Sequence, residues 1–478
     1  MAAGKMLWDF QGFGDRVALI GENRERVTYG ELHDLSEAMA EIDQSRPLVL
    51  VFSRNTLGIL CGYAALVNSG YPVMMMSAKE QVQMRKQVLN TYRPAMILIP
   101  EEQYGDYSNM QKIRSVGDCL LLKTNYPANY PVHPDLCQLL TTSGSTGSAK
   151  YVRQSRENIL CNASAIAGYL DIQADDRSIT TLPLQYTYSL SMLHAGFMKG
   201  ASVVVTDLSV LDNDFWDLLE DEKVSMFHGV PGTYEFLDRM EMFSEDFPTV
   251  KTMTQAGGKL NRELHASLAR YARTYGKRFI VMYGQSEATA AISWLEPEHS
   301  LEKAGSVGHV ISGGSLVLED ADGQTVTSAR MPGEIVYRGG NVAMGYAYCG
   351  EDLAKGDEWG GVLRTGDVGE MDEDGFLYIV GRLKRYIKVS GHRISLDEID
   401  EKILEELNVF CVSSGTDDHL LIFVTSEKDR AAVEKYIRST FYTLRNSFTT
   451  AVIDAFPKNE AGKVLYGELQ SLAEELLK

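Results

Sequence analysis

The sequence predicts an α/β protein with a second, smaller α+β domain at its C-terminal end. In the N-terminal part, a continuous apolar run at 48–52 is followed by helically spaced apolar residues from 57 to 67, and this alternation recurs at 71–92, 95–99 and 202–206. Strands that alternate with helices form parallel sheets with helices on both faces. At 478 residues the chain is long enough for two or more domains.

Two helix starts carry their own signals. Thr28 is followed three residues later by Glu31, and Ser395 stands in the same relation to Glu398. The first pair predicts a capping box, in which the two residues satisfy each other's backbone N–H groups at the first turn of a helix, and the second pair predicts another capped helix start.

The pattern changes in the second half of the chain. Short runs broken by Gly and Asp over 305–367 predict antiparallel β-structure. A Gly-Arg-Leu-Lys-Arg segment at 381–385 is followed by a βαβ-like pattern that continues to the end of the chain. We therefore predict an N-terminal domain over 1–383 and a C-terminal domain over 384–478.

Composition excludes several classes of function. The 46 basic and 65 acidic side chains give a formal net charge of -19, which argues against nucleic acid or an anionic membrane surface as the main partner. The six cysteines form no C-x-x-C pair and have no histidine at metal-ligand spacing, so reduced thiols and a cytoplasmic location are expected. No apolar stretch approaches the length of a membrane span.

A loop rich in Gly, Ser and Thr at 141–150 predicts a phosphate site. It reads T-T-S-G-S-T-G-S-A-K, so hydroxyls, glycine backbone N–H groups and Lys150 can all face an anion. A flexible linker has similar composition, but a strand-like run at 135–140 precedes this loop and helical periodicity at 156–170 follows it. Because Lys150 stands two residues beyond the expected place after Gly147, the loop is not a Walker A motif.

A second motif, Y-G-Q-S-E, follows the apolar run 279–282 and therefore lies at the end of a predicted strand. Ligands of open α/β sheets bind at such ends. The ring of Tyr283 can stack on a purine, and the carboxylate of Glu287 can bind Mg²⁺ beside a triphosphate. The alternative is a surface turn with a solvated glutamate.

Three further segments add charged groups of the same kind. Asp367 ends R-T-G-D and can accept hydrogen bonds from ribose hydroxyls. Arg382 is the second residue of the block 381–394, and Lys463 ends P-K-N-E-A-G-K. Taken singly, each has a plain alternative as a turn residue or a solvated charge.

Together these motifs resemble those of the adenylate-forming superfamily, which includes acyl-CoA synthetases, the adenylation domains of peptide synthetases and firefly luciferase. The resemblance spans residues 20–465 with the motifs in family order, and Ala149 replaces a proline of the phosphate loop. It implies a large N-terminal portion of two sheet-and-helix subdomains plus a β-barrel, with a small mobile C-terminal domain.

The resemblance also implies roles for individual residues. Lys463, Glu287 and Thr146 are expected to be catalytic, with Glu287 as the metal ligand. Lys384 is the expected hinge, Ser390 and Gly391 line the approach of the thiol, and Tyr186, His228 and Gly258 line the acyl pocket, although His228 can equally be a satisfied interior histidine. The expected ATP/AMP-binding residues are Thr142, Ser143, Gly144, Ser145, Thr146, Gly147, Lys150, Gly257, Gly258, Tyr283, Gly284, Ser286, Asp367 and Arg382.

The implied reaction converts a carboxylic acid and ATP into an acyl-adenylate and pyrophosphate, then transfers the acyl group to a thiol. The expected cofactors are ATP, Mg²⁺ and coenzyme A or the phosphopantetheine of an acyl carrier protein. One alternative is an amino-acid adenylation enzyme, but residues 185–189 lack the acid that would hold an ammonium group, since Tyr186 and Tyr188 carry no charge. A non-catalytic nucleotide-binding relative should have lost Lys463 or Glu287, and both are present. Luciferase-type oxidation has no positive sign in the sequence.

Overall fold

The structure is a computed structural model, and its two compact units are described one at a time. The first unit holds the described residues of 6–141, 150–315 and 338–363, and the second holds those of 316–337 and 364–477. The predicted domain boundary after residue 383 stays a prediction. The described residues are 6–126, 130–141, 150–383, 385–389, 392–416, 418–441, 444, 447–460 and 462–477.

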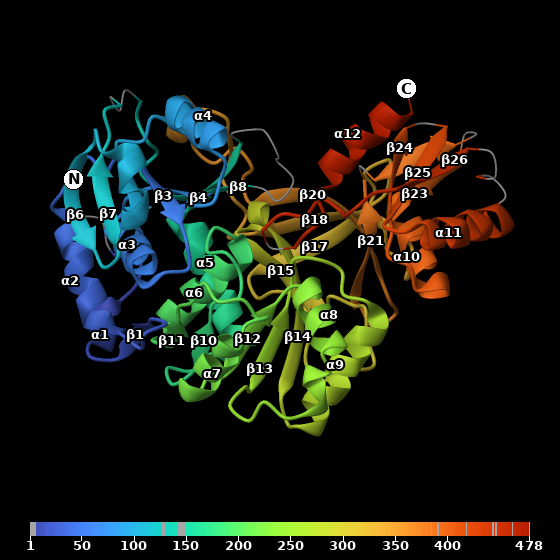
Figure 1. Ribbon diagram of the computed structural model, residues 1–478, viewed down its shortest axis with the longest axis horizontal. Helices are drawn as coiled ribbons and strands as arrows, with labels where there is room; N and C mark the ends of the chain where they lie inside the picture. The colour runs from blue at the N-terminus through green and yellow to red at the C-terminus, as the bar shows by residue number, and fades with distance from the viewer. Residues whose placement is uncertain are drawn as a thin grey trace. The chain divides into compact units, whose positions relative to one another are not determined.

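A nine-stranded sheet forms one half of the first unit (Figure 1). Its order is β16-β15-β14-β13-β12-β10-β11-β1-β2, and the six strands from β14 to β1 are parallel to one another, with antiparallel strands at both edges. The predicted strand–helix alternation is therefore confirmed here. The strands are β1 (Val17–Ile20), β2 (Arg26–Thr28), β10 (Arg177–Ile179), β11 (Ser202–Val204), β12 (Met226–Gly229), β13 (Thr252–Gln255), β14 (Arg278–Gln285), β15 (Ala290–Trp294) and β16 (His309–Val310).

Helices cover this sheet. Figure 1 shows α8 and α9 beside strands β12 to β14, and α6 contacts both β11 and β15. The helices associated with this half are α5 (Arg156–Tyr169), α6 (Thr187–Lys199), α7 (Asn213–Asp221), α8 (Pro231–Arg239) and α9 (Arg262–Thr274).

An eight-stranded sheet forms the other half, in the order β19-β9-β8-β4-β3-β5-β7-β6. Strands β8, β4, β3 and β5 are parallel, and antiparallel strands extend both edges. The strands are β3 (Val49–Ser53), β4 (Val73–Ser77), β5 (Met96–Pro100), β6 (Gln111–Val116), β7 (Cys119–Lys123), β8 (Leu136–Thr141), β9 (Tyr151–Ser155) and β19 (Gly345–Ala347).

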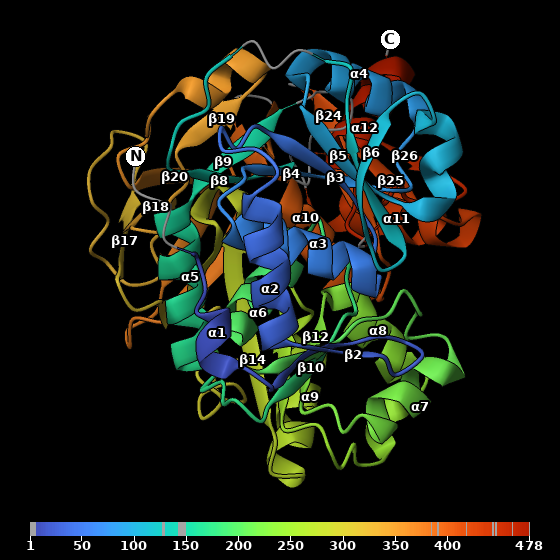
Figure 2. The same cartoon turned by 90° about the vertical axis from the view of Figure 1, so that its left-hand side faces the viewer.

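The helices of this half are α2 (Tyr29–Ala40), α3 (Leu57–Asn68) and α4 (Val82–Tyr92). Figure 2 shows α2 and α3 side by side, and α3 is buried almost all round, as its continuous apolar sequence requires. The capping box at the start of α2 is confirmed: Thr28 Oγ1 accepts from the Glu31 N–H at 3.1 Å, and the Thr28 N–H donates to Glu31 Oε2 at 2.7 Å.

The structure corrects one expectation at the phosphate loop. Sequence periodicity indicated a strand, the loop and then a helix, but β9 intervenes and pairs antiparallel with β8, so that Thr141 faces Tyr151. All five residues of β9 are buried. Three of them, Arg153, Gln154 and Ser155, are polar, and this concealed the strand from a pattern based on apolar residues. Of the loop itself, residues 142–149 lie outside the described residues.

Strands β17 (Gly314–Glu319), β18 (Gly333–Gly339), β20 (Val362–Met371) and β21 (Leu377–Arg382) form a four-stranded sheet in that order. β20 and β21 are antiparallel, in agreement with the β-structure predicted for this region. The last part of the second unit contains the hairpin β22 (Tyr386–Val389) and β23 (His392–Ser395). A three-stranded sheet follows, formed by β24 (Val412–Thr416), β25 (His419–Val424) and β26 (Phe448–Val452).

Three helices complete the second unit. They are α10 (Leu396–Leu407), α11 (Glu427–Thr440) and α12 (Tyr466–Leu476). Ser395 caps α10 by accepting from the Glu398 N–H at 3.3 Å, as the sequence predicts. The α/β fold class with a smaller C-terminal part is therefore confirmed. Throughout the part of the chain that the structure describes, the helices are too short or too polar to cross a bilayer.

Arg153 fixes the edge of the eight-stranded sheet. Its side chain is fully buried, and it donates to the carbonyl oxygens of Met344 and Tyr346 at 3.1 Å and of Gly356 at 3.2 Å. It also pairs with the carboxylate of Glu358 at 2.5 Å. One guanidinium thus holds a long excursion of the chain, 344–358, against β9.

We expect Arg153→Met to lower the free energy of unfolding by about 3 to 5 kcal/mol, because the buried carbonyls and Glu358 would lose their donor. Arg239→Met on the exposed side of α8 is the control, with an expected change within about 0.5 kcal/mol. Denaturant unfolding followed by circular dichroism measures both. Equal, small changes in the two variants would show that β9 does not depend on Arg153.

Candidate active site

The Y-G-Q-S-E motif ends β14 and turns into β15. A Cβ atom at Gly284 would lie 1.5 Å from the Ala290 carbonyl oxygen, so this position requires glycine. Ser286–Ala288 form a single 3₁₀ turn, and Thr289 and Ala290 follow with φ of 55° and 138°. Positive φ is costly for a residue with a side chain, and such strain persists only where neighbouring groups impose it.

Two buried asparagines impose this conformation. Asn341 Nδ2 donates to the carbonyl oxygens of Ala288 at 2.8 Å and Ala291 at 2.7 Å. Thr289 Oγ1 donates to the Asn341 carbonyl at 2.7 Å, and Asn162 Oδ1 accepts from the Ala291 N–H at 3.0 Å. The turn that carries Glu287 is therefore fixed on both sides by side chains distant in sequence.

One tyrosine connects Glu287 with Lys150. Tyr346 donates its hydroxyl to Glu287 Oε1 at 2.8 Å, and Lys150 Nζ lies 3.4 Å from the centroid of the Tyr346 ring. Burial, followed by the charge of Glu287, raises the pKa of Tyr346 far above its usual range, so the hydroxyl remains a donor. The pairing of β19 with β9 places Tyr346 opposite Val152, two residues after Lys150.

The donor set around Glu287 suits magnesium. Among the described residues, no three His, Cys, Asp or Glu side chains are grouped as a metal cage. Mg²⁺ differs from zinc or calcium in being held by one or two carboxylates together with substrate phosphates and water. Glu287, fixed in a rigid turn close to the lysine of the phosphate loop, is a suitable carboxylate for that arrangement.

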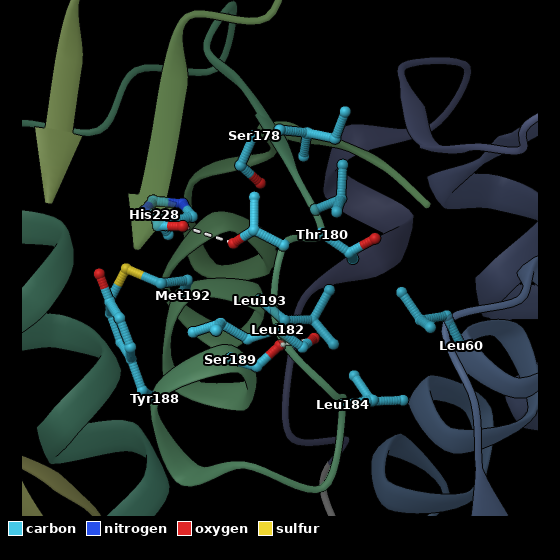
Figure 3. Close-up of a pocket in the computed structure, with 13 residues that line it drawn as sticks. Leu60, Ser178, Thr180, Leu182, Leu184, Tyr188, Ser189, Met192, Leu193 and His228 are labelled. Atoms are coloured by element: carbon cyan, nitrogen blue, oxygen red, sulfur yellow. Dashed lines mark hydrogen bonds between the residues drawn. The ribbon is translucent and has the colours of Figure 1, made fainter. Parts of the chain in front are cut away.

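A small cavity of about 20 Å³, partly open to solvent, lies between α6 and the ends of strands β10 and β12. Figure 3 shows His228, Met192 and Tyr188 on one side of it and Leu60 and Leu184 on the other. The residues that line it are Leu60, Ser178, Ile179, Thr180, Thr181, Leu182, Leu184, Tyr188, Ser189, Met192, Leu193, Val203 and His228.

His228 both lines this cavity and is a satisfied interior residue. Its Nδ1 lies 2.8 Å from Thr254 Oγ1, which is 2.6 Å from the Tyr188 hydroxyl. Burial lowers the pKa of His228 to about 4, so its ring is neutral at neutral pH. Tyr186 and Gly258 are not among the lining residues, and their assignment to the acyl pocket stays a prediction.

Gly257 and Gly258 form the turn after β13. Gly257 has φ of 84°, and the Gly258 carbonyl accepts from Gln255 Nε2 at 3.0 Å. A Cβ atom on Gly258 would lie 3.1 Å from Pro231 Cγ, so the turn packs closely against the start of α8.

In the second unit, the strand register brings two of the predicted nucleotide residues together. Asp367 on β20 faces Arg382 on β21, and Asp367 Oδ1 lies 2.9 Å from Arg382 Nε. The Asp367 side chain is 6% exposed and that of Arg382 is 49% exposed, so the pair presents its cation to solvent.

Lys463 closes a tight turn with Asn459. Its backbone N–H donates to Asn459 Oδ1 at 2.9 Å, and its carbonyl accepts from the Asn459 N–H at 2.9 Å. Gly462 adopts φ of 74° in this turn. The roles of these residues in catalysis stay predictions, as do those of the predicted residues that lie outside the described part of the chain. The latter are Thr142, Ser143, Gly144, Ser145, Thr146, Gly147, Lys384, Ser390 and Gly391.

Sequence reasoning missed Tyr346 and Gln154, and it noted Thr187 only as part of the segment 183–190 on the expected substrate side. Thr187 Oγ1 lies 2.6 Å from Ser286 Oγ, and Gln154 Nε2 donates to the Ser286 carbonyl at 2.9 Å. No motif signal marks Tyr346 or Gln154, because strand pairing brings them to the turn. Gln154 stands four residues after Lys150, but this position indicates a place in the site only when 151–155 is known to be a strand.

Comparison with known proteins identifies the family. A family model described as AMP-binding enzyme matches residues 7–347. The chain belongs to the AMP-binding enzyme family. The 2-succinylbenzoate–CoA ligase of Bacillus pumilus (strain SAFR-032) is 26% identical over 411 residues, which cover 83% of this chain and 81% of the relative. The 4-coumarate-CoA ligase 1 of Narcissus pseudonarcissus is 27% identical over 360 residues, covering 71% and 65%.

Solved structures agree with this AMP-binding fold. The o-succinylbenzoate CoA synthetase from Bacillus subtilis, in complex with its acyl-adenylate intermediate, matches with a TM-score of 0.77 at 24% identity, covering 96% of this chain and 97% of the other. ATP-bound MatB from Rhodopseudomonas palustris matches with a TM-score of 0.79 at 18% identity, covering 99% and 100%.

The predicted adenylate-forming family is thus confirmed. So is the predicted class of AMP-forming acid–thiol ligase, since the curated relatives of this AMP-binding enzyme are CoA ligases and synthetases. Their names agree with coenzyme A as an expected cofactor, and another structure of the Bacillus subtilis synthetase contains ATP and a magnesium ion.

Tyr346→Phe should raise the Mg²⁺ concentration needed for half-maximal ATP–pyrophosphate exchange by about 10-fold, the size of effect expected when a ligand carboxylate loses its outer hydrogen-bond partner. The ring under Lys150 remains in this variant, so the affinity for ATP measured without Mg²⁺ should not change. Tyr348→Phe is the matched control, because Tyr348 is 59% exposed. An unchanged Mg²⁺ requirement in Tyr346→Phe would contradict a role for this hydroxyl.

Proposed function

We propose that this enzyme activates a carboxylic acid without an α-amino group and passes the acyl group from the adenylate to coenzyme A. The observation that carries the proposal is the chemistry of the cavity beside α6. Its lining is aliphatic and hydroxyl-bearing, and none of the lining residues is acidic. The one titratable base, His228, is held neutral by burial. An ammonium group there would be buried without an anion, at a cost of several kcal/mol.

The chemistry follows from the poor leaving group of a carboxylate. Attack of the carboxylate oxygen on the α-phosphorus of ATP forms the acyl–phosphate bond and breaks the bond to pyrophosphate, so that AMP becomes the leaving group for the next step. A thiolate then forms the C–S bond at the acyl carbon and AMP departs. Positioning and neutralisation of negative charge supply most of the acceleration.

Each charged residue has a proposed part in this scheme. Glu287 holds magnesium, which neutralises phosphate charge when bound, and Lys150 faces the phosphates. Asp367 and Arg382 contact the ribose and phosphate side of the nucleotide. Lys463 neutralises charge at the α-phosphate during adenylation. Rotation of the C-terminal domain about Lys384, and thiol entry past Ser390 and Gly391, remain proposals that rest on the family resemblance.

Coenzyme A is favoured as the acceptor because the relatives are named as CoA ligases and synthetases. An acyl carrier protein is the competing acceptor. Adenylation followed by a choice of coenzyme A or a phosphopantetheinylated carrier protein distinguishes them, and a thioester formed only on the carrier protein would overturn this part of the proposal.

We expect acids without an α-amine to support ATP–pyrophosphate exchange at least about 10-fold better than their α-amino counterparts, because even one unmet buried charge costs more than the 1.4 kcal/mol that a factor of 10 represents. Matched pairs such as 3-phenylpropanoate with phenylalanine and 4-methylpentanoate with leucine test this. A preference for the amino acids would mean that another residue supplies the anion and that the proposed pocket is wrong.

Lys463→Ala should abolish adenylation but leave thioester formation from a pre-made acyl-adenylate within a few-fold of the original rate, because the charge is needed where the α-phosphate is attacked. Lys458→Ala, in the same segment, is the control. The two half-reactions are measured separately, by pyrophosphate release and by thioester formation. Equal losses in both would assign Lys463 a general structural role.

A further inference from the structure

A line of buried polar side chains runs from α6 to the turn that carries Glu287. His194 Nε2 lies 2.7 Å from the Tyr63 hydroxyl, which also contacts Gln138 Oε1. Gln138 Nε2 donates to Gln154 Oε1 at 2.8 Å, and Gln154 Nε2 donates to the Ser286 carbonyl at 2.9 Å. The four side chains come from α6, α3, β8 and β9, and each is at most 2% exposed.

The hydrogen bonds of this line all point the same way. Tyr63 donates its proton to Gln138, so its oxygen can only accept from His194. Burial lowers the pKa of His194 to about 3, which leaves its ring neutral, and because the Tyr63 oxygen accepts, the ring proton is on Nε2. Every donor therefore faces toward Ser286, and bonds aligned in this way strengthen one another in a low-dielectric interior.

A second contact joins the same helix to the same turn. Thr187, the first residue of α6, lies with its Oγ1 2.6 Å from Ser286 Oγ. Ser286 is thus held through its hydroxyl by the start of α6 and through its carbonyl by the line that begins at His194, seven residues further along that helix. The next residue is Glu287, whose own carbonyl accepts from the Ala343 N–H at 2.9 Å.

Satisfaction of interior polar groups does not by itself account for this arrangement. Four apolar side chains of similar size would fill the same volume without the cost of removing polar groups from water. The last hydrogen bond of the line also goes to a backbone carbonyl in the strained turn, and not to another side chain of the line. Its consequence is that the orientation of the Ser286–Glu287 peptide depends on a helix in the core.

We propose that His194, Tyr63, Gln138 and Gln154 are positioning residues that hold Glu287 in its magnesium-binding orientation. This inference rests on the proposed role of Glu287 in binding Mg²⁺ with ATP. The four residues hold the Glu287 carboxylate in place before any ligand binds. A charged group that is already in place needs no reorganisation when the ligand arrives.

The test measures binding of α,β-methylene ATP by calorimetry in Mg²⁺ and in excess chelator. Gln154→Met keeps the side-chain length and removes the donor to Ser286. We expect its dissociation constant in Mg²⁺ to rise by about 10-fold, the typical effect of losing an outer partner of a metal ligand, with no change in chelator. Gln173→Met, at an exposed glutamine, is the matched control and should match the original protein in both buffers.

Tyr63→Phe keeps the test decisive if Gln154→Met does not fold. Three hydrogen bonds in sequence separate its hydroxyl from the Ser286 carbonyl, so it should weaken binding in Mg²⁺ by less than Gln154→Met and leave binding in chelator unchanged. Unchanged binding in Mg²⁺ for a folded variant would overturn the proposal, as would an equal loss in both buffers. Because the assay uses no acid, it can fail while the acid-activation function stands, and the reverse also holds.

Discussion

Strand β9 is the constraint on which the rest of the site depends. Successive side chains of a strand point to opposite faces, so adjacent residues of one strand can serve two different regions. Arg153 gathers the carbonyls and Glu358 of the 344–358 segment on one face, while Gln154 reaches Ser286 on the other. β9 also emerges directly from the phosphate loop. One short strand therefore connects three parts of the candidate active site that are distant in sequence.

Strand register explains how other distant residues meet. Tyr346 comes close to Lys150 because β19 pairs with β9, and Arg382 meets Asp367 because β21 pairs with β20. In the first pair a tyrosine ring faces a cation, and in the second a carboxylate does. In both pairs the backbone hydrogen bonds between strands bring the two groups together, although they are far apart in sequence. Cations placed locally in this way are compatible with the proposed binding of a nucleoside triphosphate by a chain whose net charge is -19.

Much of this organisation could be predicted from the sequence. The α/β class, the caps at Thr28 and Ser395, the family and the motif carrying Glu287 follow from local patterns that the fold does not override. Strand β9 was missed because its interior positions hold Arg153 and Gln154, whose polarity is satisfied only by partners far along the chain. Tyr346 and the line from His194 were missed for the same reason. Their function comes from tertiary hydrogen bonds, which leave no periodic signal in the sequence.

The positive φ of Ala290 has a consequence for anyone who would engineer this enzyme. Glycine at that position would relieve the strain in the folded state, and a search for heat-tolerant variants would select it on that ground. The same change would allow the backbone of the turn to adopt more conformations. Thermal tolerance and readiness for catalysis are therefore opposing objectives at this residue, and a selection for one alone would erode the other.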